Sequence, residues 1–131
     1  MIESSEEFIR LRKSSDPLEY QRAANDNAPL DVWREIVDRY PEMRIWVIHN
    51  KTIPVEILTS LFGDEDPLVR EAVARKRKCP EGILFALATD PDVRVRQAVA
   101  YNAKASSNIL AILSEDSSPN VATQAKSRLR G

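Results

Sequence analysis

The 131-residue chain has few of the residues that build catalytic and cofactor sites. Its only histidine is His49, its only cysteine is Cys79, and its three glycines are Gly63, Gly82 and Gly131. Zinc sites need three or four clustered Cys, His or carboxylate ligands, and phosphate-binding loops need clustered glycines. A nucleophile also needs a base beside it, whereas His49 and Cys79 fall at different levels of the stack of helix pairs that the internal repeat predicts. The sequence therefore predicts that the protein is not an enzyme and uses no metal, cofactor or small-molecule substrate.

Long apolar segments and an excess of one charge are lacking as well. No segment approaches the roughly 20 apolar residues of a membrane span, and residues 1–13 lack the apolar stretch of a signal peptide. A lone cysteine forms no internal disulfide, so we expect a cytoplasmic protein without membrane contact. Lys and Arg total 19 against 20 Asp and Glu, so an anionic partner would need a local basic patch. The length is that of one domain, 1–131.

What the chain does have is an internal repeat. The string DEDPLVREAVA at 64–74 recurs as DPDVRVRQAVA at 90–100, an offset of 26 residues from 64 to 90. The same offset relates Leu61 to Leu87 and Asp64 to Asp90. Because such self-similarity marks a repeat architecture, we divide the chain into about five units: 1–28, 29–53, 54–79, 80–105 and 106–131.

Each repeat is predicted to be a pair of short helices. The first helix starts near a proline such as Pro80 and carries an apolar stripe such as Ile83, Leu84 and Leu87. The second helix opens with an aspartate cap such as Asp66. Helices of about ten residues are unstable alone in water, so neighbouring pairs must stack. The predicted fold is all-α, a right-handed α-solenoid of about five 25–26-residue helix pairs.

The repeated residues resemble the leucine-rich repeat variant and HEAT-like repeats of bacterial proteins. The resemblance is carried by Asp-Pro-Asp at 90–92, Val-Arg at 69–70 and 95–96, Ala-Val-Ala at 72–74 and 98–100, Asn102, and Pro80 with Ile83-Leu84. It implies a non-catalytic scaffold that binds another protein. Some variant-repeat proteins hold an iron–sulfur centre on an amino-terminal cysteine cluster, but this chain has no cysteine before Cys79. Small proteins of this type are also similar to bacterial immunity proteins, which neutralise a toxin by occluding it.

An enzymatic alternative follows from the same resemblance, because HEAT-like repeats also form small DNA glycosylases with a basic concave groove. Trp33, Trp46, Glu42 and Arg44 supply only a fragment of such a site. About five repeats also give little wrap around a duplex. The glycosylase hypothesis is therefore disfavoured.

Charge is sorted by the repeat. Acidic residues gather where the first helix of a pair meets the second, and basic residues gather between one pair and the next. One charge at each helix end complements the helix dipole, but the run Arg75, Lys76, Arg77 and Lys78 exceeds that need. We therefore predict a binding ridge at the ends of the second helices, facing a protein with an acidic surface, with nucleic acid as the alternative partner. Its residues are His49, Asn50, Arg75, Lys76, Arg77, Lys78, Tyr101, Asn102 and Lys104.

Other conspicuous side chains are assigned to structure. Arg44, Arg70 and Arg96 occupy equivalent positions, and we expect them to bridge to the capping aspartates of the neighbouring loop. Trp33 belongs to a first-helix stripe and is predicted to lie in the core. Trp46 takes a position that later repeats give to alanine, where it either fills the core or projects into a groove; the core is the favoured prediction.

Overall fold

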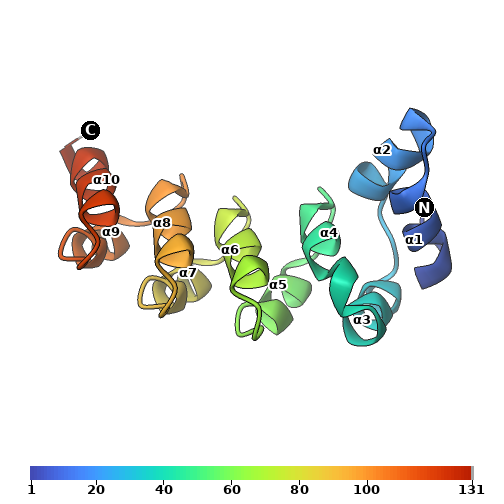
Figure 1. The fold of residues 1–131 in the computed structure, drawn as a ribbon, viewed down its shortest axis with the longest axis horizontal. Coiled ribbons are helices and arrows are strands. Elements are labelled where there is room, and N and C mark those ends of the chain that lie inside the picture. Colours follow the sequence, from blue (N-terminus) through green and yellow to red (C-terminus); the bar gives the residue numbers. More distant parts are fainter. Residues whose placement is uncertain (131) are drawn as a thin grey trace. The chain divides into compact units, whose positions relative to one another are not determined.

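A computed structural model describes residues 1–130 of the chain. These residues form ten α-helices and one 3₁₀ helix, and they include no strand. The helices are α1 (Ser5–Lys13), α2 (Pro17–Asn25), α3 (Leu30–Arg39), η1 (Pro41–Met43), α4 (Arg44–His49), α5 (Val55–Leu61), α6 (Pro67–Arg75), α7 (Glu81–Leu87), α8 (Val93–Tyr101), α9 (Ser107–Leu113) and α10 (Pro119–Arg130) (Figure 1). The predicted all-α class is confirmed, while the right hand and the number of repeats remain predictions.

The chain packs as two compact units, Met1–Leu58 and Thr59–Gly131. In the first unit α1 packs on α2 and α3, α3 packs on α4, and α2 contacts α4. Phe8 and Trp33 meet edge to face at the centre, with ring centroids 5.5 Å apart. Trp33 is only 1% exposed, so its predicted place in the core is confirmed.

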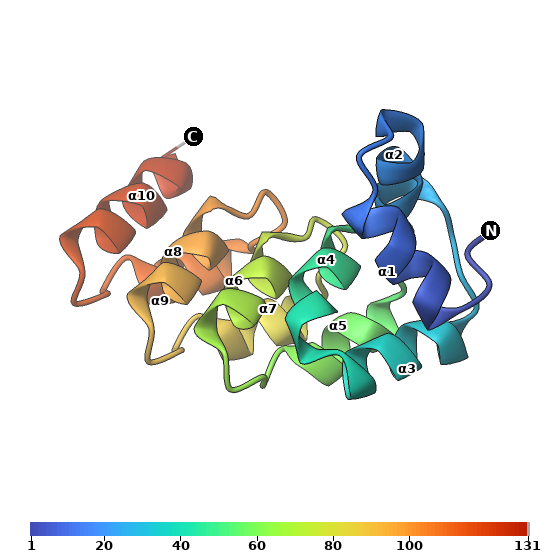
Figure 2. The same cartoon turned by 45° about the vertical axis from the view of Figure 1, so that its right-hand side comes forward.

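In the second unit the helices α6, α8 and α10 lie side by side (Figures 1 and 2). The helix α7 contacts both α6 and α8, and α9 contacts both α8 and α10. The predicted stripe of α7 is buried as a whole, since Ile83, Leu84 and Leu87 are each less than a tenth exposed. The first helices of the pairs, α7 and α9, therefore cover one side of the row formed by α6, α8 and α10.

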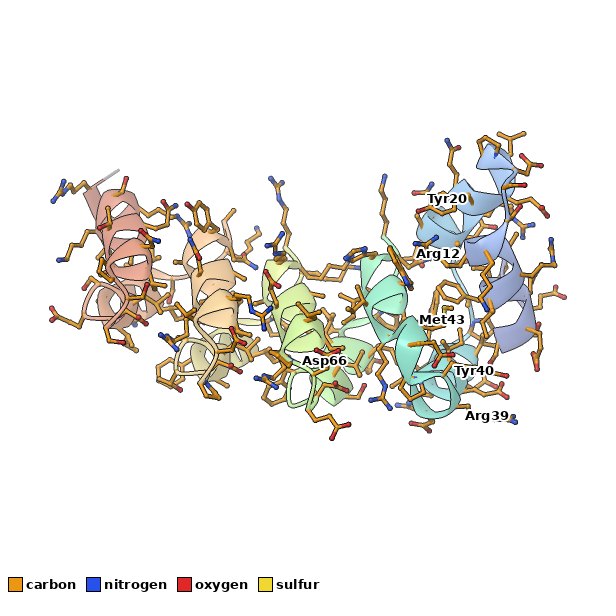
Figure 3. All side chains as sticks on the ribbon, in the orientation of Figure 1. Arg12, Tyr20, Arg39, Tyr40, Met43 and Asp66 are labelled. Carbon is orange, nitrogen blue, oxygen red and sulfur yellow. The ribbon has the colours of Figure 1, made fainter. Side chains whose placement is uncertain are left out.

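The helix starts follow the predicted capping chemistry. The side chain of Asp66, labelled just before α6 in Figure 3, accepts a hydrogen bond of 2.9 Å from the backbone N–H of Leu68. Asp92 accepts a bond of 2.8 Å from the N–H of Arg94 in the same way. Each carboxylate satisfies a backbone donor that has no partner within its own helix.

A buried arginine–aspartate pair recurs in the second unit. The Nε of Arg70 donates to Asp90 Oδ2 at 2.8 Å, and its Nη1 donates to the carbonyl of Asp64 at 2.7 Å. Arg96 repeats both bonds 26 residues later, to Asp116 Oδ2 at 2.8 Å and to the carbonyl of Asp90 at 2.9 Å. Arg70 and Arg96 thus bridge to an aspartate of the next loop as predicted, but Asp90, bound by Arg70, stands two residues before the actual helix cap, Asp92. The bridge of Arg44 remains a prediction; Arg44 donates to the Val37 carbonyl at 2.8 Å.

These bonds also perturb the ionisation of the pairs. The hydrogen bond to Asp90 raises the pKa of Arg70. For Asp116 the largest influence is burial, which raises the pKa, but hydrogen bonds from Arg96 and from the Ser118 N–H outweigh it and leave the pKa of Asp116 lowered. A carboxylate with a depressed pKa stabilises the fold above its unfolded pKa and loses that contribution as the pH falls through its folded pKa. The pairs are therefore stabilising at neutral pH.

A second recurring contact joins consecutive second helices. The Nδ2 of Asn102, just after α8, donates to the carbonyls of Ala74 and Lys76 at the end of α6, at 2.7 and 2.9 Å. Arg128 donates from α10 to the carbonyls of Ala100 and Asn102, at 2.8 and 2.6 Å. Because the last carbonyls of a helix have no partner within it, each second helix supplies the donors that the preceding one lacks.

The buried stripe of α7 generates a stability prediction. Leu87 is 2% exposed, so Leu87→Ala should leave a cavity and lower the free energy of unfolding by about 2–5 kcal/mol. Phe85→Ala on the same helix is the matched control, since Phe85 is 56% exposed and should change stability little. Thermal unfolding followed by circular dichroism measures both. If the two variants melt together, the proposed register of the repeats is wrong.

The arginine–aspartate pairs generate a second stability prediction. Arg70→Lys keeps the charge but loses the planar fork that binds Asp90 and the carbonyl of Asp64, and it should destabilise the fold by about 1–3 kcal/mol. Arg94→Lys is the control, because the pair between Arg94 and Asp92 is solvated, with the Arg94 side chain 53% exposed. Urea denaturation at pH 7 should separate the two variants. Equal and small effects would show that the buried pair does not stabilise the stack.

Candidate interaction surface

A surface groove lies between α6 and α8 in the second unit. Because Asn102 joins the end of α8 to the end of α6, the two helices run in the same direction. Between them is a hollow of about 490 Å³. Glu71 and Arg75 line it from α6, and Arg94, Gln97, Ala98 and Tyr101 line it from α8.

The groove is lined by one small side chain and by several long ones. Ala98 is 6% exposed and adds only a methyl group to the floor. Tyr101, at the end of α8, is 61% exposed and stands as an aromatic wall. Arg75 Nη2 is 2.7 Å from Glu71 Oε2 on α6, and Arg94 Nη2 is 2.8 Å from Asp92 Oδ2 at the start of α8. The side-chain hydrogen bond from Arg94 lowers the pKa of Asp92 to about 2, so this carboxylate is ionised at neutral pH.

One end of the groove is bordered by basic loops. Lys76, Arg77 and Lys78 follow α6, and Lys104 follows α8. Lys76 is half-buried, and burial, followed by the nearby Lys78, lowers the pKa of Lys76. The side chains of Arg77, Lys78 and Lys104 are exposed. Since the capping aspartates stand at the opposite helix ends, the groove runs from an acidic end to a basic end.

Two residues of the predicted ridge do not lie on the surface. Asn50 is 0% exposed and its Nδ2 donates to the carbonyls of Ala23 and Asp26, each at 2.9 Å. Asn102 is 5% exposed and is used in the same way against the end of α6. An amide can donate to two carbonyls and also accept a backbone N–H, which suits it to the interior of a helix junction. The position of these asparagines directly after a helix was the signal for this role.

His49 lies in the first unit, whereas the other surface residues of the predicted ridge lie in the second. Its ring meets Trp46 edge to face, with centroids 5.4 Å apart. Together with Arg12, Tyr20, Ala23 and Ala24 these two rings line a pocket of about 110 Å³. Arg75 and Tyr101 share the larger groove described above. The predicted ridge as a continuous surface therefore remains a prediction.

Trp46 corrects a prediction. Its side chain is half-exposed and lines the pocket of the first unit, so the favoured core position is wrong. In the pocket the ring lies against Arg12, whose guanidinium carbon is 3.4 Å from the centroid of the Trp46 ring, a cation–π contact. Trp33, by contrast, is enclosed in the core and cannot stack on a nucleobase, which removes one aromatic from the glycosylase hypothesis.

Sequence reasoning missed four residues of the groove: Glu71, Arg94, Gln97 and Ala98. A helical-spacing signal was present, because positions 94, 97 and 101 lie on one face of a helix. The repeat pattern did not indicate this face, because Arg94 and Gln97 differ in residue type and in charge from the residues at the equivalent positions of the neighbouring repeat. Side chains on an exposed helix face vary without disturbing the packing.

Cys79, the thiol of the sequence, is buried. Burial raises the pKa of the Cys79 thiol to about 11, so the thiol is protonated at neutral pH and is a weak nucleophile. Within residues 1–130, no group of three or more His, Cys, Asp and Glu side chains is placed to hold a metal ion. No helix in that part of the chain has the length and apolar character needed to cross a membrane.

Part of the chain matches a known protein family. Residues 67–92, which run from the start of α6 to the cap of α8, match the family described as leucine rich repeat variant. No curated protein and no solved structure matches the chain. Repeats of this family generally serve protein–protein interaction. Residues 67–92 are therefore similar to a leucine rich repeat variant repeat, as the resemblance of the repeated residues predicted.

Proposed function

We propose that the protein is a non-catalytic binding module that holds an acidic segment of a partner protein in the groove between α6 and α8. The observation that carries this proposal is the open hollow of about 490 Å³ between two tightly packed helices, with Tyr101 and Arg75 at its basic end. Interface hot spots are enriched in Tyr, Trp and Arg. The groove offers both an aromatic anchor and guanidinium groups at one place.

The pairing of charges in the groove favours a protein over a nucleic acid. Arg75 is paired with Glu71 and Arg94 with Asp92, so a phosphate backbone would meet a carboxylate beside each arginine. Non-specific nucleic-acid binding depends on cations that replace the counterions of successive phosphates. A protein segment can instead place its acidic side chains at the basic loops and other side chains beside Tyr101 and the paired arginines, which a uniformly anionic phosphate backbone cannot do.

The basic loops have a separate role in this proposal. The side chains of Arg77, Lys78 and Lys104 are exposed in the loops that follow α6 and α8. Exposed clustered charges accelerate the encounter of two proteins more than they strengthen the final complex. We assign association rate to these loops and the lifetime of the complex to Tyr101 and Arg75.

The anchor is tested by Tyr101→Ala. Loss of a central aromatic anchor of an interface costs about 2 kcal/mol or more, so the dissociation constant should rise at least about thirtyfold. The partner is recovered by affinity purification from the native host with the wild-type chain, and its affinity is measured by calorimetry. Phe85→Ala removes an equally exposed aromatic from α7 outside the groove and should bind like the wild type. Equal binding by both variants would contradict the proposed surface.

The basic loops are tested by changing Arg77, Lys78 and Lys104 together to glutamine. Association should slow strongly and lose most of its dependence on salt, because the steering charges are gone. The melting temperature should stay close to that of the wild type, since an exposed charge contributes about 1 kcal/mol or less. Stopped-flow association at several salt concentrations measures the effect, and an unchanged rate would remove the loops from the surface.

Two narrower hypotheses can be tested with the same purified protein and its recovered partner. Binding of random duplex DNA or RNA with a steep salt dependence, about 0.9 log units per log of salt for each phosphate on duplex DNA, would favour the nucleic-acid alternative. An immunity-type role requires that the recovered partner be a toxin whose activity is lost in the complex. Its gene is expected beside the gene of this chain.

A further inference from the structure

The first unit contains a groove of its own, between α2 and α4. An arginine from α1 enters it: the guanidinium carbon of Arg12 lies 4.7 Å from the ring centroid of Tyr20 on α2 and 3.4 Å from that of Trp46 on α4. Figure 3 shows the labelled Arg12 and Tyr20 next to each other at α2. The two rings therefore hold one cation between helices that contact each other.

The held guanidinium has no anionic partner. Within residues 1–130 Arg12 makes neither a hydrogen bond nor an ion pair, and its Nε is buried without an acceptor. The other arginines near this end of α1 and α2 are occupied, Arg22 by Asp26 at 2.7 Å and Arg10 by Glu19. The half-buried arginines of the second unit, Arg70 and Arg96, each bind an aspartate. Arg12 is thus a positioned cation whose hydrogen-bonding capacity is unused.

We propose that Arg12 is the receptor of a carboxylate-binding site, which takes a glutamate or aspartate side chain of a peptide into the pocket beside Tyr20, Trp46 and His49. The pocket of about 110 Å³ has room for a carboxylate with its methylene group. Aromatic rings pack against the guanidinium, so the ligand reaches it at its edge, where two N–H groups of the fork match two carboxylate oxygens. This site lies in the first unit and does not rest on the function proposed for the groove of the second.

The composition of the pocket selects a carboxylate over a phosphate. Besides Arg12, Tyr20, Trp46 and His49, its walls are the methyl groups of Ala23 and Ala24. One guanidinium balances the single charge of a carboxylate, whereas a phosphate monoester carries about two negative charges at neutral pH. Apolar walls also exclude water and strengthen the attraction between the paired charges.

A purely structural role for Arg12 would use only the two ring contacts. Cation–π contacts to Tyr20 and Trp46 tie α1 to α2 and α4 without any ligand. In that case the fold would need Arg12, but the pocket would show no preference for an acid. The two roles are separated by a ligand titration rather than by stability.

The test is a nuclear magnetic resonance titration of the full chain at pH 7, following the N–H signals of the Arg12 side chain and the Trp46 indole. The probes are the capped tripeptide glycyl-glutamyl-glycine and its glutaminyl counterpart. The glutamyl peptide should shift both signals in a saturable way, and the glutaminyl peptide should not. Equal shifts with both peptides, or none that saturate, would overturn the proposal and leave Arg12 a structural contact.

Variants locate the site and phosphate tests the choice of anion. Arg12→Gln should weaken the glutamyl peptide at least tenfold, whereas Lys13→Gln, the same change of charge on an exposed neighbour in α1, should leave its affinity within twofold. If Arg12→Gln fails to fold, Arg12→Lys replaces it, because it keeps the charge but lacks the fork; a loss of affinity is again expected. Inorganic phosphate that binds more tightly than the glutamyl peptide, or a Lys13 variant that loses binding equally, would overturn the assignment.

Discussion

The last carbonyls of a helix have no hydrogen-bond partner within it, and this constraint organises both units. The second helices α6 and α8 have nine residues each, too short to persist alone in water. Each is completed by donors from the next one: Asn102 closes the end of α6, and Arg128 closes the end of α8. In the first unit Asn50 does the same for the end of α2. The repeat is therefore a unit of hydrogen-bond completion as much as of apolar packing.

The helices, their caps and the arginine–aspartate pairs could be predicted from the sequence because they recur. A stripe such as that of α7 and a cap such as Asp66 are local patterns, and the offset of 26 residues places them in register. The bridges of Arg70 and Arg96 followed from the same offset, since each arginine has an aspartate 20 residues later. The asparagine ties were the exception, because a polar residue at a helix end suits the surface as well as the interior.

The candidate sites could be predicted only in part, because they depend on what differs between repeats. Tyr101 and Arg75 were found through the concentration of charge and aromatic character at helix ends. Arg94 faces the groove from the first turn of α8 and Gln97 from its middle, and the repeat pattern carries no information about such exposed residues. The cluster of Arg12, Tyr20 and Trp46 joins α1, α2 and α4, and no spacing in the sequence relates the three side chains.

One position shows how a repeat scaffold produces different surfaces. Position 98 holds alanine on α8, and the equivalent position 46 holds tryptophan on α4. The alanine lines a hollow of about 490 Å³ bordered by paired charges, while the tryptophan lines a hollow of about 110 Å³ and stacks on an arginine without an anionic partner. The backbone ties at the helix ends are the same beside both positions, because they use Asn50 and Asn102. Since the scaffold satisfies its own hydrogen bonds elsewhere, this position is free to set the size and the charge chemistry of each groove.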